Sequence, residues 1–337
     1  MFRRLTLAWL ALAAAPTPWL IPLLSGHAAA HGQADRFLRD DDIWLLAGVT
    51  AAMLALPLAW APARVLARRL KGTVPPKVVV ASAAVLVAAV AWAGASLVFG
   101  GYPLSRDEDM VGFGASILAH GQVWAPLAPG WRAFAAALEP EFVRFSAGAA
   151  FWRPAYLPGN AALLALARGA GLARLLNPAL AAVSVLAVFA IARRLWPDRP
   201  GRALVAALLL ATSSQLLITA MTPYAMTAQL AFNLAWLWLY LRGGRAGHAG
   251  ALAVGFVATG LHQLVFHPLF VAPFVLQLWL DRRWRMAALY TLAYAAICLF
   301  WLDFAPLTLA AAGGAAPVGG VGGARALGGQ IAALVGG

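Results

Sequence analysis

The residues with the clearest chemical potential lie in one short segment, Ser105–Gln122, which reads SRDEDMVGFGASILAHGQ. Directly after the apolar run Val78–Gly100 come three consecutive acids, Asp107, Glu108 and Asp109. The whole chain has only 12 acidic residues among 337, so three of them at the end of an apolar run need a reason. Carboxylates at such a place could act as a general base, bind a cation or cap a helix.

The same segment has the pattern of a short amphipathic helix on the outer face of a membrane. Ser105 and Glu108 have the spacing of a capping box, and acids in a first turn suit the positive end of the helix dipole. An apolar stripe and a glycine stop follow, at Met110, Phe113, Ile117, Leu118 and Gly121. Capping alone would explain Ser105 and Glu108, but it leaves Asp107 and Asp109 without a role.

A second segment, Phe151–Asn160, is rich in proline and aromatic residues and predicts a rigid loop at the membrane interface. Arg153 stands among these aromatics. It is either an interfacial anchor or a contact for a phosphate group, since a guanidinium offers a planar fork of donors. Tyr156, in the same loop, is a further candidate for substrate binding.

The third segment is Gly260–Pro268, with His262 and His267 five residues apart. This spacing does not place both rings on one helix face, so a zinc site has weak support. The two histidines are either interfacial residues at a helix turn or polar groups that serve a function. Tyr224, in a predicted outer turn, is either an interface aromatic or a contact for a sugar or an acceptor.

The composition is that of a helical membrane protein. Hydrophobic residues make up 63% of the chain, charged residues 11%, and the mean hydropathy is +0.79. A helix needs roughly 20 apolar residues to cross a bilayer. Eight segments approach or exceed that length: Leu5–Leu24, Ile43–Ala63, Val78–Gly100, Pro178–Ala192, Ala203–Met221, Ala225–Leu241, Ala251–Leu280 and Met286–Trp301. Strand-like alternation does not dominate, which argues against a membrane β-barrel. The single cysteine, Cys298, excludes an intrachain disulfide.

The net charge of +13 indicates topology rather than nucleic-acid binding. Sixteen of the 25 lysine and arginine residues fall in alternate loops that we assign to the cytoplasm. These loops are Met1–Arg4, Arg64–Lys77, Arg193–Arg202, Arg242–His248 and Asp281–Arg285. The acidic segment then faces outward.

We therefore expect an all-α polytopic membrane protein with about 8–10 transmembrane helices and a large extracytoplasmic loop that bears amphipathic interfacial helices. Residues 1–100 would hold the first helices, with a signal-like start over 1–30 that is either cleaved or retained. Residues 101–177 would form the extracytoplasmic catalytic loop and 178–303 a helix bundle. Residues 304–337 would form a Gly/Ala-rich tail, compatible with an incomplete chain. Ala251–Leu280 is either one tilted helix or, as its basic ends favour, a tight hairpin that turns near His262–Pro268.

The segment DEDMVGFGASILAHGQVWAP resembles the acidic signature in the first large outer loop of glycosyltransferases of the GT-C superfamily. These include protein O-mannosyltransferases and lipid A aminoarabinose transferases. The run from Arg153 to Trp196 resembles the stretch that follows in that family, with its proline-glycine turn and a helix ending in Arg-Arg-Leu. Met110-Val111 and Leu157 depart from the pattern, as does the missing acid near Tyr224. The resemblance covers roughly Tyr102–Leu241.

The resemblance implies an inverting transfer of a hexosyl or pentosyl sugar from a polyprenyl-phosphate donor in membrane lipid. The acceptor would be an extracytoplasmic lipid, glycan or protein, and the location a bacterial inner membrane. Asp107 would be the general base, Glu108 its support and Asp109 the substitute. Arg153, with His262 and His267, would neutralise the departing phosphate. No cofactor is required, although a divalent cation would be compatible with the acids.

Two other functions fit parts of the pattern. A transporter or flippase of lipid-linked intermediates would need polar residues along its spans, and there are few. A non-catalytic assembly subunit would use the acidic helix only for capping and docking. The sequence contains no Walker A, GxSxG, HExxH or CxxC motif.

Overall fold

The computed structural model describes residues 47–48, 51, 74–103, 105–138 and 142–311. The chain divides into two compact units, Met1–Pro75 and Pro76–Gly337, and we describe the second by itself. The signal-like start and the tail beyond residue 311 lie outside the described residues. So do the predicted spans Leu5–Leu24 and Ile43–Ala63, except for the helical residues 47, 48 and 51.

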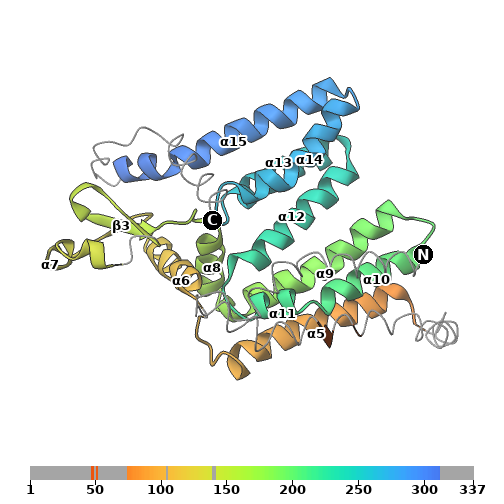
Figure 1. The fold of residues 1–337 in the computed structure, drawn as a ribbon, viewed down its shortest axis with the longest axis horizontal. Coiled ribbons are helices and arrows are strands. Elements are labelled where there is room, and N and C mark those ends of the chain that lie inside the picture. The colour runs from red at the N-terminus through yellow and green to blue at the C-terminus, as the bar shows by residue number, and fades with distance from the viewer. Residues whose placement is uncertain (1–46, 49–50, 52–73, 104, 139–141, 312–337) are drawn as a thin grey trace, which may run out of the picture. The chain divides into compact units, whose positions relative to one another are not determined.

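Helices dominate the second unit (Figure 1). The α-helices are α5 (Pro76–Leu97), α6 (Arg106–Ala119), α7 (Pro129–Arg132), α8 (Gly159–Gly169), α9 (Leu176–Leu195), α10 (Pro200–Ala211), α11 (Ser214–Ala220), α12 (Ala225–Arg242), α13 (Gly244–Thr259), α14 (Phe266–Leu280) and α15 (Trp284–Ala311). Short 3₁₀ helices are η2 (Ala135–Ala137), η3 (Ala147–Ala149) and η4 (Ala173–Leu175). The strands are β1 (Ala125–Pro126), β2 (Val143–Phe145) and β3 (Phe151–Pro154).

Among the described residues, three helices are long and apolar enough to cross a membrane: α5, η4 with α9, and α15. The pair α10 and α11 adds a fourth if its two helices, bent by 53°, form one span. These findings confirm an all-α membrane protein. The bend was not predicted within Ala203–Met221. It occurs at Thr212 and Ser213, where the Ser213 hydroxyl accepts from the N–H of Leu216 and so caps a new helix.

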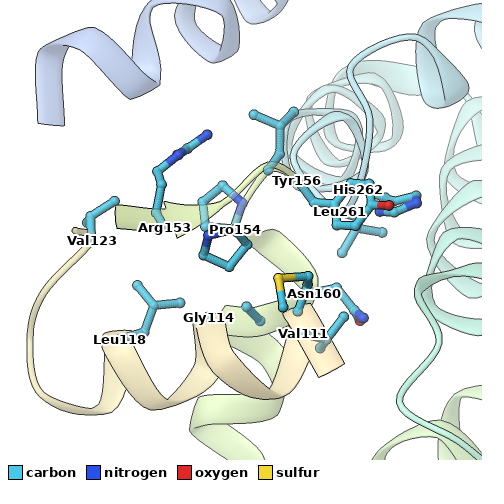
Figure 2. Close-up of a pocket in the computed structure, with 14 residues that line it drawn as sticks. Val111, Gly114, Leu118, Val123, Arg153, Pro154, Tyr156, Asn160, Leu261 and His262 are labelled. Atoms are coloured by element: carbon cyan, nitrogen blue, oxygen red, sulfur yellow. The ribbon is translucent and has the colours of Figure 1, made fainter. Parts of the chain in front are cut away.

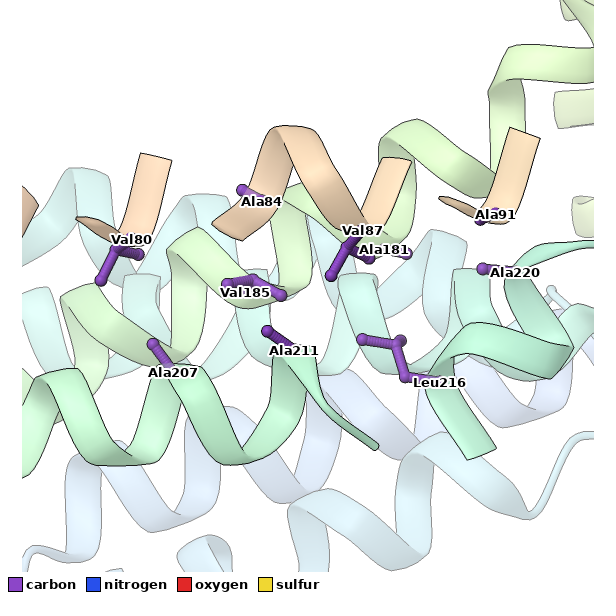
Figure 3. Packing of buried hydrophobic residues seen from close by; sticks show 10 residues of the cluster. All are labelled: Val80, Ala84, Val87, Ala91, Ala181, Val185, Ala207, Ala211, Leu216 and Ala220. Atoms are coloured by element: carbon purple, nitrogen blue, oxygen red, sulfur yellow. The ribbon is translucent and has the colours of Figure 1, made fainter. Parts of the chain in front are cut away.

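Helices α5, α9, α10 and α11 form what we call the alanine-packed group. Its buried core consists mainly of alanine and valine side chains, shown in Figure 3. Inside a membrane, helix association depends on close packing, because lipid tails are as apolar as leucine. Small side chains allow that approach, and Gly94 extends it by leaving room for the end of Met221.

Helices α12 to α15 pack around Trp236, which is fully buried and in ring contact with Tyr240, Phe270, Phe274 and Tyr290. The predicted segment Ala251–Leu280 contains most of α13 and all of α14, and the turn 260–265 separates the two helices. A single continuous helix over this segment is thus wrong, and the break begins slightly earlier than the predicted turn near His262–Pro268. Pro268 lies in the first turn of α14, where a proline costs no intrahelical hydrogen bond.

The segment between α5 and α9 contains a small sheet that was not predicted. Its three antiparallel strands have the order β1-β3-β2, with Trp152 of β3 paired with both Ala125 and Phe145. Strands of two to four residues leave no periodic signal in a sequence, which explains the omission. At the other end of the unit, α15 continues to Ala311, so the first residues of the predicted tail are helical.

Candidate functional site

Glu108 fixes the start of α6. Its side chain is 1% exposed, and its Oε2 accepts a hydrogen bond of 3.0 Å from the Ser105 N–H. This is the Glu108 half of the predicted capping box. Its Oε1 accepts a 2.8 Å bond from the Thr222 hydroxyl, which lies between α11 and α12. Glu108 therefore both caps its helix and ties it to a distant turn.

The carboxylate of Asp107 accepts hydrogen bonds from two tyrosine hydroxyls. The Tyr156 hydroxyl donates to its Oδ1, and the Tyr224 hydroxyl donates to its Oδ2 at 3.2 Å. Burial, then the hydrogen bond to Asp107, raises the pKa of Tyr156. Burial, then the charge of Asp107, raises the pKa of Tyr224. Both hydroxyls thus remain protonated donors at neutral pH. Each carboxylate oxygen has two lone pairs, so one on each remains for a ligand.

His262 borders the same place from the turn between α13 and α14. Its ring centroid lies 4.1 Å from that of Tyr156. Burial lowers the pKa of His262, while the nearby charge of Asp107 acts in the opposite direction. The imidazole is therefore neutral at pH 7, with an ordinary value already at about 6.5.

Backbone hydrogen bonds join the predicted rigid loop to this turn. The N–H groups of Leu157, Gly159 and Asn160 donate to the carbonyls of His262, Gly260 and Leu261, at 2.8, 2.7 and 3.2 Å. The approach is so close that a Cβ at position 159 would lie 2.5 Å from the Gly260 carbonyl oxygen. Glycine at position 159 is thus required by contact rather than by an unusual backbone angle.

Two asparagines complete the connection. The Asn160 amide donates to the Pro223 carbonyl at 3.1 Å. The Asn177 amide donates to the carbonyls of Thr222 and of Tyr224, the latter at 3.0 Å. We call the four segments joined in this way the junction: residues 105–109, 154–160, 222–224 and 260–262. Asn160, Asn177 and Thr222 were missed by the sequence reasoning, although buried polar residues beside apolar helices were an available signal.

Arg153 of β3 is a buried cation beside the junction. It is 5% exposed, its guanidinium carbon lies 5.3 Å from the centroid of the Trp124 ring, and its Nε has no hydrogen-bond partner among the described residues. Burial, and then repulsion from Arg144 across the sheet, lowers the pKa of Arg153 to about 10. Arg153 thus stays charged at neutral pH and could attract an anionic group.

A small pocket lies between α6, β3 and the turn 260–265 (Figure 2). Met110, Arg153, Tyr156, Asn160 and His262 are among its lining residues, and its volume is about 30 Å³. This volume holds about two water molecules, far less than the space that a sugar ring needs. The pocket could receive one small polar or anionic group next to Tyr156.

Two predicted site residues lie elsewhere. Asp109 is exposed and borders a different pocket, together with Arg106 and Met110. His267 is fully buried in α14, where its Nδ1 is 2.7 Å from Asn233 Oδ1 and its Nε2 is 2.8 Å from the Tyr294 hydroxyl. Of the predicted residues, the structure brings Asp107, Tyr156, Tyr224 and His262 together, with Glu108 and Arg153 adjacent.

No three histidine, cysteine, aspartate or glutamate side chains in the described part of the chain are grouped so that they could hold a metal ion. Comparisons with protein-family models, with curated proteins and with solved structures gave no match for this chain.

Proposed function

We propose that this membrane protein is a glycosyltransferase that moves a sugar from a polyprenyl-phosphate donor to a hydroxyl of an extracytoplasmic acceptor. The observation that carries the proposal is the carboxylate of Asp107, oriented by the hydroxyls of Tyr156 and Tyr224. Residues separated by more than 100 positions in the chain meet around this one acid. Such convergence fixes the position of the carboxylate, which a catalytic group requires.

In the proposed reaction Asp107 acts as general base. The acceptor oxygen attacks the anomeric carbon, its proton passes to a free lone pair of Asp107, and the bond from that carbon to the phosphate oxygen breaks. The lipid phosphate leaves with the electron pair of that bond. The two tyrosine hydroxyls hold the carboxylate in place, which reduces the reorganisation needed when the proton is transferred.

Arg153 is the proposed contact for the leaving phosphate. It is a buried cation that stays protonated at neutral pH, and its Nε has no hydrogen-bond partner among the described residues. An anion would satisfy that group and offset the cost of burying its charge. The pocket that Arg153 lines has room for only part of a phosphate group, so the rest of the donor would lie outside it.

The location belongs to the same proposal. With the basic loops in the cytoplasm, the junction would lie on the outer side of a bacterial inner membrane. The whole chain would have about eight to ten transmembrane helices. A donor with its tail in lipid and its phosphate at the membrane surface could reach Asp107 without leaving the bilayer.

The proposal is tested by sugar transfer from radiolabelled polyprenyl-phosphate donors in membranes that contain Asp107→Asn or unaltered protein. Asp198→Asn is a matched control, since Asp198 is exposed and distant in sequence from every junction segment. General bases contribute about 10²–10⁴-fold, so we expect Asp107→Asn to lower transfer roughly a thousandfold. Equal transfer by the two variants would remove Asp107 from the chemistry. Absence of transfer by the unaltered protein with every donor would refute the function itself.

A further inference from the structure

A second pocket shares Met110 with the small one. Its volume is about 490 Å³, and Met110 lines both pockets. Binding sites for small molecules usually have volumes of about 300–1,000 Å³. The small pocket beside Tyr156 is too small for a sugar ring, whereas this one has the required space. We call it the Trp152 pocket.

The walls of the Trp152 pocket are aromatic and come from separate elements. Phe113 belongs to α6, Phe142 precedes β2 and Trp152 lies in β3. The rings of Phe113 and Trp152 have centroids 4.7 Å apart, and Phe145 stacks on Trp152 at 6.3 Å. Because Trp152 is held by these contacts, its ring would lose little conformational freedom when a ligand binds.

The polar part of the Trp152 pocket comes from the first turn of α6. Arg106 and Asp109 both line it and are three positions apart, so they lie on one side of the helix. Among the described residues that line the pocket, these two are the charged ones, one cation and one anion. A donor side chain and an acceptor side chain beside aromatic walls suit a ligand that has an apolar face and a rim of hydroxyl groups.

We propose that the Trp152 pocket binds a pyranose ring of a glycan acceptor. The C–H face of the ring would lie against Trp152 and Phe113, and its hydroxyls would bond to Asp109 and Arg106. The inference rests on the proposed function and deepens it, because it makes the acceptor a glycan rather than a lipid or a protein. It also gives Asp109 a binding role distinct from the base role of Asp107, which lies two residues earlier on α6 and so on a different face of the helix.

The direct test is photo-crosslinking with a hexopyranoside that carries a diazirine. Ala137 lines the pocket and is exposed, so Ala137→Trp should fill the pocket without removing a hydrogen bond. Ala136→Trp is the matched control, because Ala136 is exposed on the same 3₁₀ helix but does not line the pocket. In the unaltered protein the label should map to the peptides that contain Phe113 and Trp152.

We expect Ala137→Trp to reduce this labelling about tenfold, the loss that corresponds to ~1.4 kcal/mol, while Ala136→Trp keeps it. Equal labelling of the two variants would overturn the inference. So would labelling of the same peptides by a diazirine fatty acid that the hexopyranoside does not displace, because the pocket would then hold an acyl chain.

Transfer kinetics separate a failure of this inference from a failure of the proposed function. If both hold, Ala137→Trp raises the KM for a glycan acceptor above that of Ala136→Trp. If the unaltered protein transfers sugar but Ala137→Trp has the acceptor KM of Ala136→Trp, only the pocket assignment is wrong. If labelling maps to the pocket but no transfer occurs, the glycan site stands and the transferase function fails.

Discussion

The alanine-packed group and the junction are built on opposite principles. In the alanine-packed group, the buried core is mainly apolar, and the buried hydroxyls of Ser184 and Thr219 donate to carbonyls of their own helices. In the junction, four short segments meet through hydrogen bonds from backbone N–H groups, two asparagine amides and hydroxyls that donate to two acids. The first arrangement tolerates adjustment, because small apolar contacts can shift slightly. The second depends on individual atoms, and this is where the candidate chemistry lies.

The largest difference between the two regions should appear when a methyl group is added at a glycine of the junction. Gly159→Ala would place its Cβ 2.5 Å from the backbone oxygen of Gly260. Because backbone cannot move aside without breaking the three hydrogen bonds of the junction, we expect a loss of roughly 3 kcal/mol in the free energy of unfolding. Denaturant unfolding in detergent measures this, with Gly130→Ala as control, since that glycine has no neighbour within 4 Å. A change equal to that of the control would contradict the account.

A smaller loss in the free energy of unfolding is expected when Glu108, the buried acid of the junction, is replaced. Glu108→Ala removes the acceptor of both the Ser105 N–H and the Thr222 hydroxyl. Leaving such donors buried and unpaired should lower the free energy of unfolding by about 2 kcal/mol. The double variant with Thr222→Val shows whether the two groups are coupled. If the single losses add without an interaction energy, the bond between Glu108 and Thr222 contributes nothing.

A pH dependence should follow from His262. Burial holds its pKa below the ordinary value, so the folded state takes up its proton at lower pH than the unfolded state does. Its contribution to stability is therefore complete above about pH 6.5 and is lost as the pH falls further. Melting temperatures in detergent should decline on acidification more in the unaltered protein than in His262→Gln. Parallel declines would show that His262 does not titrate in this way.

The smallest effect is expected in the alanine-packed group. Gly94→Ala would bring a Cβ within 2.6 Å of Met221, a distance similar to that in Gly159→Ala. Here the neighbour is the flexible end of a methionine side chain, which can adopt another rotamer. We therefore expect the free energy of unfolding to change by less than about 1 kcal/mol. Unfolding under the same conditions as for Gly159→Ala makes the comparison. Equal losses at the two glycines would abolish the distinction between the regions.

The helices were predictable because their signals are local. Length and apolarity located α5, α9 and α15, and the spacing of Ser105 and Glu108 located the start of α6. The break between α10 and α11 escaped because Thr212 and Ser213 are only weakly unfavourable within a helix. The small sheet was not predicted because strands of two to four residues are too short to show a recognisable alternation of apolar and polar residues.

The site was only partly predictable, for a physical reason. Asp107 stood out because it is a charge at the end of an apolar run. The tyrosines that orient it come from residues 49 and 117 positions further along the chain, and such pairings depend on the fold. Asn160 and Asn177 stood out only as polar residues beside apolar helices, and the carbonyls of the distant turn that their amides bond to depend on the fold. The sequence thus predicted Asp107, Tyr156 and Tyr224 as separate site residues, but not that the two tyrosine hydroxyls bond to the acid.

The most direct measurement compares Asp107→Asn with Glu108→Gln, scoring sugar transfer per folded molecule alongside the melting temperature. In the proposed mechanism Asp107 is the base, and Glu108 supports the fold around it. We therefore expect Asp107→Asn to lose roughly a thousandfold in transfer with little change in melting temperature. Glu108→Gln should melt earlier and keep most of its transfer. The reverse pattern, or equal transfer by both variants, would contradict the central claim that Asp107 is the base.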